Sequence, residues 1–234
     1  MIFSTARPGQ GTPNTQRGVS IVELLVGLAI GLFIVATGLT LLTGNLRENR
    51  GLLLEARLMQ DLRSAADMVV RDLRRAGYWT DAEAGVWQRG ASGVAANPYT
   101  AVSPSAAASD TVTFRFSRDA TENHTVDSNE QFGFRLRAGV LEMLLGSGNW
   151  QAMTDASTVA VTAFSVTPEV QSLSLEAFCA ADCPPGSSTC PPRQQVRSLE
   201  VSLSGKAVSD ATVLRSVRSA VRLRNDLVTG ACPV

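Results

Sequence analysis

Hydrophobic residues follow three different patterns along the chain, and the first is a long run without charge. No charged residue occurs from Leu24 to Leu46. A helix over these residues rises about 35 Å, which is enough to cross a hydrocarbon core of about 30 Å. The run therefore predicts a membrane-spanning helix over residues 24–46.

The second pattern is a single apolar stripe in residues 47–76. Apolar side chains recur there at every third or fourth position, namely Leu54, Leu58, Leu62, Ala65, Val69, Leu73 and Ala76. This spacing places them on one face of a helix. No proline interrupts the chain between Val19 and Ala96, and Gly77 supplies a C-terminal stop. We therefore expect one helix over residues 19–76, whose second half packs on the domain that follows.

The third pattern is a set of short alternating runs beyond Trp79. Period-two alternation bounded by Gly, Pro, Asn and Ser marks half-buried strands. The candidate strands are residues 111–117, 131–137, 140–145, 158–166, 172–178, 198–203 and 219–224. Residues 85–108 contain few bulky side chains and predict a long irregular connection. The fold class expected is α+β, with a long N-terminal helix packed on an antiparallel β-sheet domain.

The charges that flank the apolar run indicate its orientation. Residues 1–18 contain Arg7 and Arg17 and no acid, whereas the other flank mixes Arg47 and Arg50 with Glu48. The positive-inside rule favours a cytoplasmic N-terminus with everything after residue 46 exported. A secretory signal peptide fits less well, because its apolar core is shorter and is followed by a small-residue cleavage site.

Glu23 stands at the start of the apolar run, between Val22 and Leu24. An ionised carboxylate there is costly unless it is paired or reaches water. Taken alone, Glu23 has two interpretations: it marks the membrane boundary, or it has a partner of opposite charge.

The segment RGVSIVELLV, residues 17–26, resembles the processing motif of type IV prepilins. The resemblance implies that a prepilin peptidase removes residues 1–18 as a leader, cuts between Gly18 and Val19, and methylates the new amine of Val19. The family usually has Phe first, where this chain has Val19. Glu23 then takes the place of the family's assembly carboxylate at the fifth mature position. Its pairing with the Val19 amine would remove two uncompensated charges from apolar surroundings.

Residues 69–79 and 221–225 are similar to PilW-like minor pilins, which have an extended β-rich domain. The resemblance implies a structural subunit that helps to prime or build a type IV pilus. The alternatives are a type II secretion pseudopilin or a membrane-anchored exported protein unrelated to filaments. Gly27 and Gly31 form a GxxxG spacing, which either packs helices together or is tolerated glycine in a membrane helix.

The expected partners follow from the same resemblance. They are other pilins or pseudopilins through the N-terminal helix, the prepilin peptidase, and the bacterial inner membrane. The chain would be a single-pass protein whose domain, residues 77–234, lies in the periplasm before entering a pilus or pseudopilus.

Composition and motifs argue against catalysis and against nucleic acid. The 21 basic and 21 acidic side chains balance, whereas phosphate binding needs excess Lys and Arg. The single histidine, His124, lies in a polar stretch that is typical of a solvated loop, and no catalytic or phosphate-binding motif is visible. We expect no enzyme activity, no cofactor and no metal. The spacing of the acids Asp110, Asp119, Glu122 and Asp127 does not match a known calcium loop.

Four cysteines, Cys179, Cys183, Cys190 and Cys232, lie in the last quarter of the chain. An even number in an exported, loop-rich stretch favours disulfides, and the spacing does not match a standard zinc site. Three connectivities are open. We favour Cys183 with Cys190, because the Pro-Pro-Gly segment after Cys183 can turn the chain, which leaves Cys179 for Cys232.

Overall fold

The computed structural model describes residues 18–85 and 95–233. The chain divides into two units, Met1–Arg50 and Gly51–Val234. Helix α1 (Ile21–Leu73) contributes to both units, and all of its buried side chains belong to the second. The long helix predicted from the sequence is therefore confirmed, with its start two residues later and its end three residues earlier than expected.

The end of α1 is set by its last backbone hydrogen bonds. Arg75 N–H and Ala76 N–H donate to carbonyls three residues back, at 2.9 and 3.0 Å, which tightens the last turn. Gly77 then takes a φ of +75° and donates its N–H to the Arg115 carbonyl at 2.8 Å. Gly77 thus ends the helix as expected, and it also ties the helix end to the neighbouring sheet.

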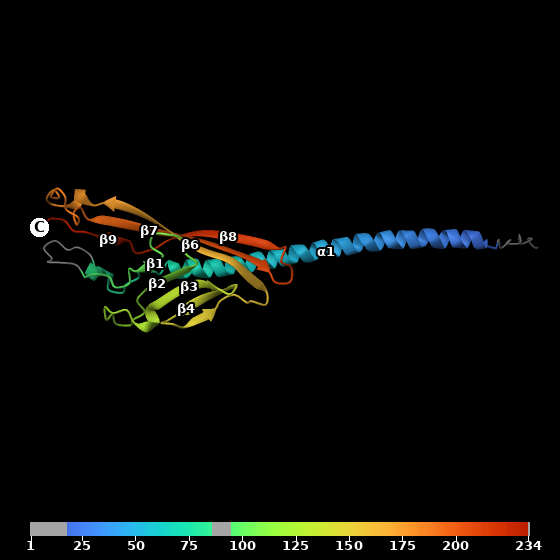
Figure 1. The fold of residues 1–234 in the computed structure, drawn as a ribbon, viewed down its shortest axis with the longest axis horizontal. Coiled ribbons are helices and arrows are strands. Elements are labelled where there is room, and N and C mark those ends of the chain that lie inside the picture. The colour runs from blue at the N-terminus through green and yellow to red at the C-terminus, as the bar shows by residue number, and fades with distance from the viewer. Residues whose placement is uncertain (1–17, 86–94, 234) are drawn as a thin grey trace, which may run out of the picture. The chain divides into compact units, whose positions relative to one another are not determined.

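Two antiparallel sheets follow α1 in the second unit (Figure 1). The first has the order β1-β2-β3-β4-β5, with β1 (Val102–Ser103), β2 (Thr111–Arg115), β3 (Gln131–Arg137), β4 (Val140–Leu145) and β5 (Trp150–Ala152). The second has the order β6-β7-β8, with β6 (Val159–Ser174), β7 (Arg193–Ala207) and β8 (Leu214–Arg222), while β9 (Leu227–Thr229) also pairs with β7. The described residues also form the short 3₁₀ helices η1 (Ala82–Gly85), η2 (Ser128–Glu130) and η3 (Glu176–Phe178).

The hairpin β3–β4 confirms two of the predicted strands to the residue. Its two-residue turn consists of Ala138 and Gly139, whose φ angles are +51° and +78°. Two positive φ angles give the turn a twist that matches the flanking strands. The Arg137–Val140 register follows directly from this turn.

One core joins α1 to both sheets. The stripe of α1 contributes Leu58, Leu62, Ala65, Val69 and Leu73, and four stacked phenylalanines come from β2, β3 and the residue that follows β2. Gly205 of β7 allows close approach of the helix, because a β-carbon there would lie 3.1 Å from Leu62 Cδ2. Ser109 and Val166 exchange two backbone hydrogen bonds that link the sheets. The α+β class is therefore confirmed, with two sheets where one was expected.

The strands of the second sheet differ from their predicted bounds. A single strand, β6, replaces the two strands predicted over residues 158–166 and 172–178. It ends at Ser174, and residues 176–178 form η3. Strands β7 and β8 begin five residues before their predicted starts. Of the predicted connection 85–108, the described part contains the short strand β1, and residues 86–94 lie outside the described structure.

Candidate functional site

The N-terminal segment places the predicted processing site directly before a helix. Gly18, Val19 and Ser20 are not helical, and α1 begins at Ile21. The Leu24 N–H donates to the Ser20 carbonyl at 3.0 Å, so the first turn forms immediately. Glu23 lies in this first turn, where the helix dipole favours a negative charge. Residues 1–17 of the predicted leader, which include Arg7 and Arg17, lie outside the described residues.

Every described side chain from Gly18 to Arg50 is exposed. The exposed groups include large apolar side chains such as Phe33 and Leu41, each 71% exposed. Continuous apolar exposure of this kind marks a membrane or protein contact. Among the described helices, α1 has a segment long and apolar enough to cross a membrane.

The threonine hydroxyls within the apolar run are satisfied by the helix itself. The hydroxyls of Thr37, Thr40 and Thr43 donate to backbone carbonyls three residues earlier, at 2.8 to 3.0 Å. Such internal bonds remove the need for water in an apolar environment. A β-carbon added at Gly27 or Gly31 meets nothing within 4 Å, so both glycines offer open helix surface.

The structure does not bring Glu23 to a charged Val19 amine. With the leader attached, the Val19 nitrogen belongs to a peptide bond and carries no charge. The pairing of these two groups therefore stays a prediction about the processed chain. The same holds for cleavage between Gly18 and Val19 and for methylation of Val19.

The four cysteines form two disulfides, in the pairing favoured from the sequence. Cys179 pairs with Cys232 across a sequence separation of 53, and Cys183 pairs with Cys190 across a separation of 7. The Cα–Cα distances are 5.3 and 5.5 Å, within the usual range for disulfides. The longer link ties the chain near its end to the segment that follows β6 and η3.

A polar network fills the loop between β2 and β3. Tyr99 and Glu130 are both 0% exposed, and Glu130 lies at the end of η2. The Tyr99 hydroxyl lies 3.0 Å from Glu122 Oε1 and 3.1 Å from Glu130 Oε2. Backbone N–H groups of Arg118 and Asp127 donate to the Glu130 carboxylate at 2.7 and 2.9 Å. Glu130 and Tyr99 thus organise this loop, although the sequence analysis singled out neither.

The network shifts the protonation of its members. Burial raises the pKa of Tyr99, and the hydrogen bond to Glu122 raises it further. Burial disfavours the charged form of Glu122, but hydrogen bonds led by that from Ser117 outweigh it and hold the pKa of Glu122 below its usual range. Partial burial, together with nearby carboxylates of which Glu130 is foremost, raises the pKa of Asp119.

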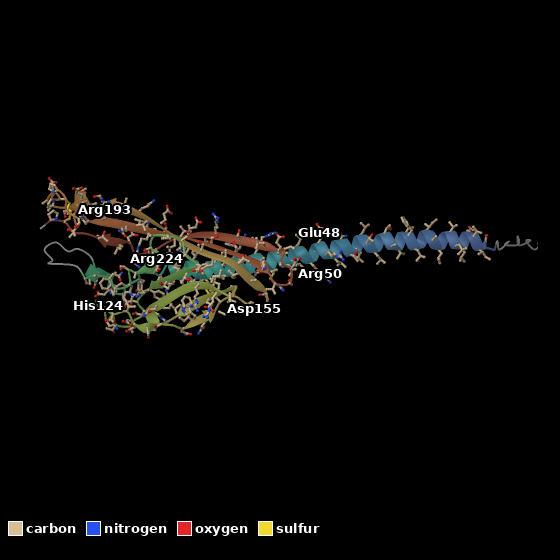
Figure 2. The ribbon with its side chains drawn as sticks, viewed as in Figure 1. Glu48, Arg50, His124, Asp155, Arg193 and Arg224 are labelled. Atoms are coloured by element: carbon tan, nitrogen blue, oxygen red, sulfur yellow. A yellow bond between two sulfur atoms is a disulfide. The ribbon has the colours of Figure 1, made fainter. Side chains whose placement is uncertain are left out.

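His124 lies in this loop and is partly tethered rather than freely solvated (Figure 2). Its side chain is 51% exposed, and Nε2 lies 3.4 Å from the Asp81 carboxylate. Its ring meets the Trp79 ring edge to face, with 5.6 Å between centroids. Among the described residues no serine hydroxyl bonds to His124, and Ser117 bonds to Glu122 instead. These contacts connect the loop to the segment that follows α1.

Comparison with known proteins gives one match, which spans most of the second unit. Residues 51–223 match the family model described as prepilin peptidase-dependent protein B. No curated protein and no solved structure matches the chain. The matched residues exclude the leader and the charge-free run, so the match and the processing motif come from separate parts of the chain.

Proposed function

We propose that this chain, which belongs to the prepilin peptidase-dependent protein B family, is a minor pilin that helps to prime or build a type IV pilus. Membership makes the chain a pilin-like exported protein that depends on prepilin peptidase. The role in a pilus is the further step proposed here. In this proposal, residues 1–18 are the leader, residues 19–76 the pilin-type helix, and residues 77–234 the exported domain.

One observation carries the proposal, namely the exposed apolar helix that begins within the processing motif, just after the predicted cleavage site. Its apolar side chains from Ile21 to Leu46 are all exposed in the described chain. A membrane can cover them before assembly, and the helices of other subunits can cover them in a filament. The second unit, Gly51–Val234, carries its own core, so the part of α1 before Gly51 is not needed to fold it.

Glu23 gives this helix a means of recognising its neighbours. After cleavage the Val19 amine is a cation, and a carboxylate in the first turn of a neighbouring or the same helix neutralises it. Without that partner, an uncompensated charge in apolar surroundings costs several kcal/mol. Correct insertion of a subunit is therefore favoured over a misplaced one.

The substitution Glu23→Ala tests this role. Removing a charge eases membrane insertion, so the variant should reach the inner membrane at the level of the unaltered chain. Its amount in sheared pili, measured by quantitative peptide mass spectrometry, should fall several-fold. Glu48→Ala is the matched control, because Glu48 is also an exposed acid of α1 but lies beyond the charge-free run (Figure 2).

Normal incorporation of the Glu23→Ala variant would refute the assembly role. A type II secretion pseudopilin shares the same N-terminus, so the deletion strain separates the two machines. Loss of surface pili with normal secretion supports the minor pilin. Loss of secretion with normal pili assigns the chain to the pseudopilus.

A further inference from the structure

Strand β8 is a long sheet edge without a partner on one side among the described residues. It pairs with β7 alone over Leu214–Arg222, in an unbroken register. The other long edge strand, β6, contains a register shift between Val161 and Ala163 and also contains Pro168. The edge strands β1, β5 and β9 have two or three residues each. Bulges, prolines and short length protect sheet edges against unwanted pairing, and β8 has none of them.

The backbone of β8 presents every second residue to this free edge. In an antiparallel pair, hydrogen-bonded residues alternate with residues whose N–H and C=O point away from the partner strand. The Ala207 N–H donates to the Val213 carbonyl at 3.1 Å, and the Leu223 N–H donates to the Arg197 carbonyl at 3.0 Å. The odd-numbered residues between these two bonds therefore bond to β7. The even-numbered residues, which include Ala220, direct their N–H and C=O groups outward.

A groove of about 430 Å³ lies between β8 and α1. One wall is α1, with Met59, Arg63 and Asp67 at intervals of four positions, and the other wall is residues 216–219 of β8. Positions four apart lie on one face of a helix, so both walls are regular and rigid. The helix wall spans about 12 Å and the strand wall about 10 Å. The groove is therefore long enough for about three or four residues of an extended chain.

The charges along this edge have one sign. Strand β8 contains Arg215, Arg218 and Arg222 and no acid, and the first and last of these pair with acids of the same chain. The Arg218 side chain is 76% exposed, and its contact with the Glu200 carboxylate is 3.9 Å long. Arg63 takes part in none of the ion pairs between described side chains. The groove lining holds two arginines and one aspartate, so its net charge is positive.

We propose that the free edge of β8 binds an extended segment, rich in acidic side chains, of another pilin subunit. The segment adds a strand to the second sheet through the outward backbone groups of β8. Its carboxylates meet Arg63 and Arg218. A second copy of β8 does not suit this edge, because arginines would lie opposite arginines and like charges across a strand pair are destabilising. The binding edge follows from the geometry of β8, whereas the origin of the segment in a pilus subunit rests on the proposed function.

Binding of designed peptides to the full chain in micelles of an uncharged detergent tests the edge. The probe is a short fluorescent peptide in which Glu alternates with Val, and the control is the same peptide with Lys in place of Glu. In fluorescence anisotropy, the Glu peptide should bind at least about tenfold more tightly than the Lys peptide, because only its charges complement the groove. An increase from about 0.02 to about 0.5 M salt should weaken that binding, since exposed charges are screened.

Variants of β8 separate backbone pairing from charge. Ala220→Pro removes an outward N–H and no bond to β7, so it should keep the fold and abolish binding of the Glu peptide. Ala220→Val keeps the N–H and is the matched control, which should bind normally. Arg218→Glu makes the groove lining net negative and should remove the preference for the Glu peptide. The unfolding midpoint of each variant checks that the second unit folds, and Arg218→Glu decides if Ala220→Pro does not fold.

The source of the segment is tested in cells. A photocrosslinking amino acid in place of Ser216, another residue of the free edge, should link to an acid-rich segment of another pilin, identified by peptide mass spectrometry. A link to a protein that is not a pilin would overturn this origin, and a link to β8 of a second copy would overturn the proposal.

Equal binding of the two peptides would also overturn the proposal, as would normal binding by a folded Ala220→Pro variant. Peptide binding needs no pilus, so these failures are distinct from a failure of the proposed function, which Glu23→Ala tests.

Discussion

Gly77 occupies a backbone conformation that residues with a β-carbon adopt only with strain. Its φ is +75°, and a β-carbon would meet its nearest neighbour, Asn225 Cβ, at 3.5 Å. That distance is an ordinary contact, so the cost of Gly77→Ala lies in the backbone rather than in a clash. A left-handed conformation costs a residue with a β-carbon about 1–2 kcal/mol.

Gly77→Ala should therefore lower the free energy of unfolding by about 1–2 kcal/mol. Gly51→Ala is the matched control, because Gly51 lies inside α1 and nothing lies within 4 Å of an added β-carbon. That control should be neutral or stabilising by up to about 1 kcal/mol. Denaturant unfolding of both variants in micelles measures the difference, and a neutral Gly77→Ala would contradict the role of this turn.

Single residues also show where sequence reasoning succeeds and where it fails. The prediction that Gly77 ends the helix came from a local rule and was confirmed, apart from the three residues between the last helical residue and the turn. Glu130 was missed because its importance depends on burial beneath Tyr99, which lies 31 residues earlier in the chain. The capping-box spacing of Asp127 and Glu130 is a local signal that could have found it, because the Asp127 N–H donates to the Glu130 carboxylate.

Among the elements, α1 derives its tertiary stability from one stripe. Leu62 is 0% exposed and contacts the region of Gly205, whereas Leu53 is 71% exposed. Leu62→Ala should cost about 2–5 kcal/mol through lost burial and the cavity left behind. Leu53→Ala, which makes the same chemical change on the open face, should stay within about 0.5 kcal/mol. Similar losses in both variants would show that the stripe does not pack as described.

The two disulfides should contribute unequally to stability. In the chain-entropy model, the Cys179–Cys232 link stabilises the native state by about 4 kcal/mol and the shorter Cys183–Cys190 link by about 2.5 kcal/mol. The double variant Cys179→Ser/Cys232→Ser should therefore unfold at lower denaturant than Cys183→Ser/Cys190→Ser. Peptide mapping without reductant checks the pairing itself, and free thiols or the other connectivities would contradict it.

Strand β6 shows why its sequence was divided into two. Every residue from Glu169 to Ser174 is exposed and the preceding Pro168 is only partly buried, so no buried face continues the alternation of residues 158–166 across this stretch. The ladder with β7 nevertheless continues to Ser174, because backbone hydrogen bonds do not depend on side-chain polarity. Strand β3 was predictable because Phe132 and Phe134, on one of its faces, are both buried.

At the scale of the whole molecule, the sequence predicted the α+β class but not the division of the strands into two sheets. A charge-free run and a striped helix followed by alternating strands predict an α+β chain, and the segment of residues 17–26 adds the resemblance to pilins. The division of the strands into two sheets depends on long-range pairing, such as that of β6 with β7, which alternation along one strand does not encode. The family match to residues 51–223 then supports the same class from the exported part alone.

The N-terminal mass of the mature protein tests the central claim most directly. The chain should be purified from a strain with an active prepilin peptidase and analysed by intact-mass and N-terminal peptide spectrometry. Cleavage between Gly18 and Val19 predicts a mature chain that begins at Val19 and carries one added methyl group. A mature chain that still begins at Met1, or one cut beyond the apolar run, would contradict processing as a pilin.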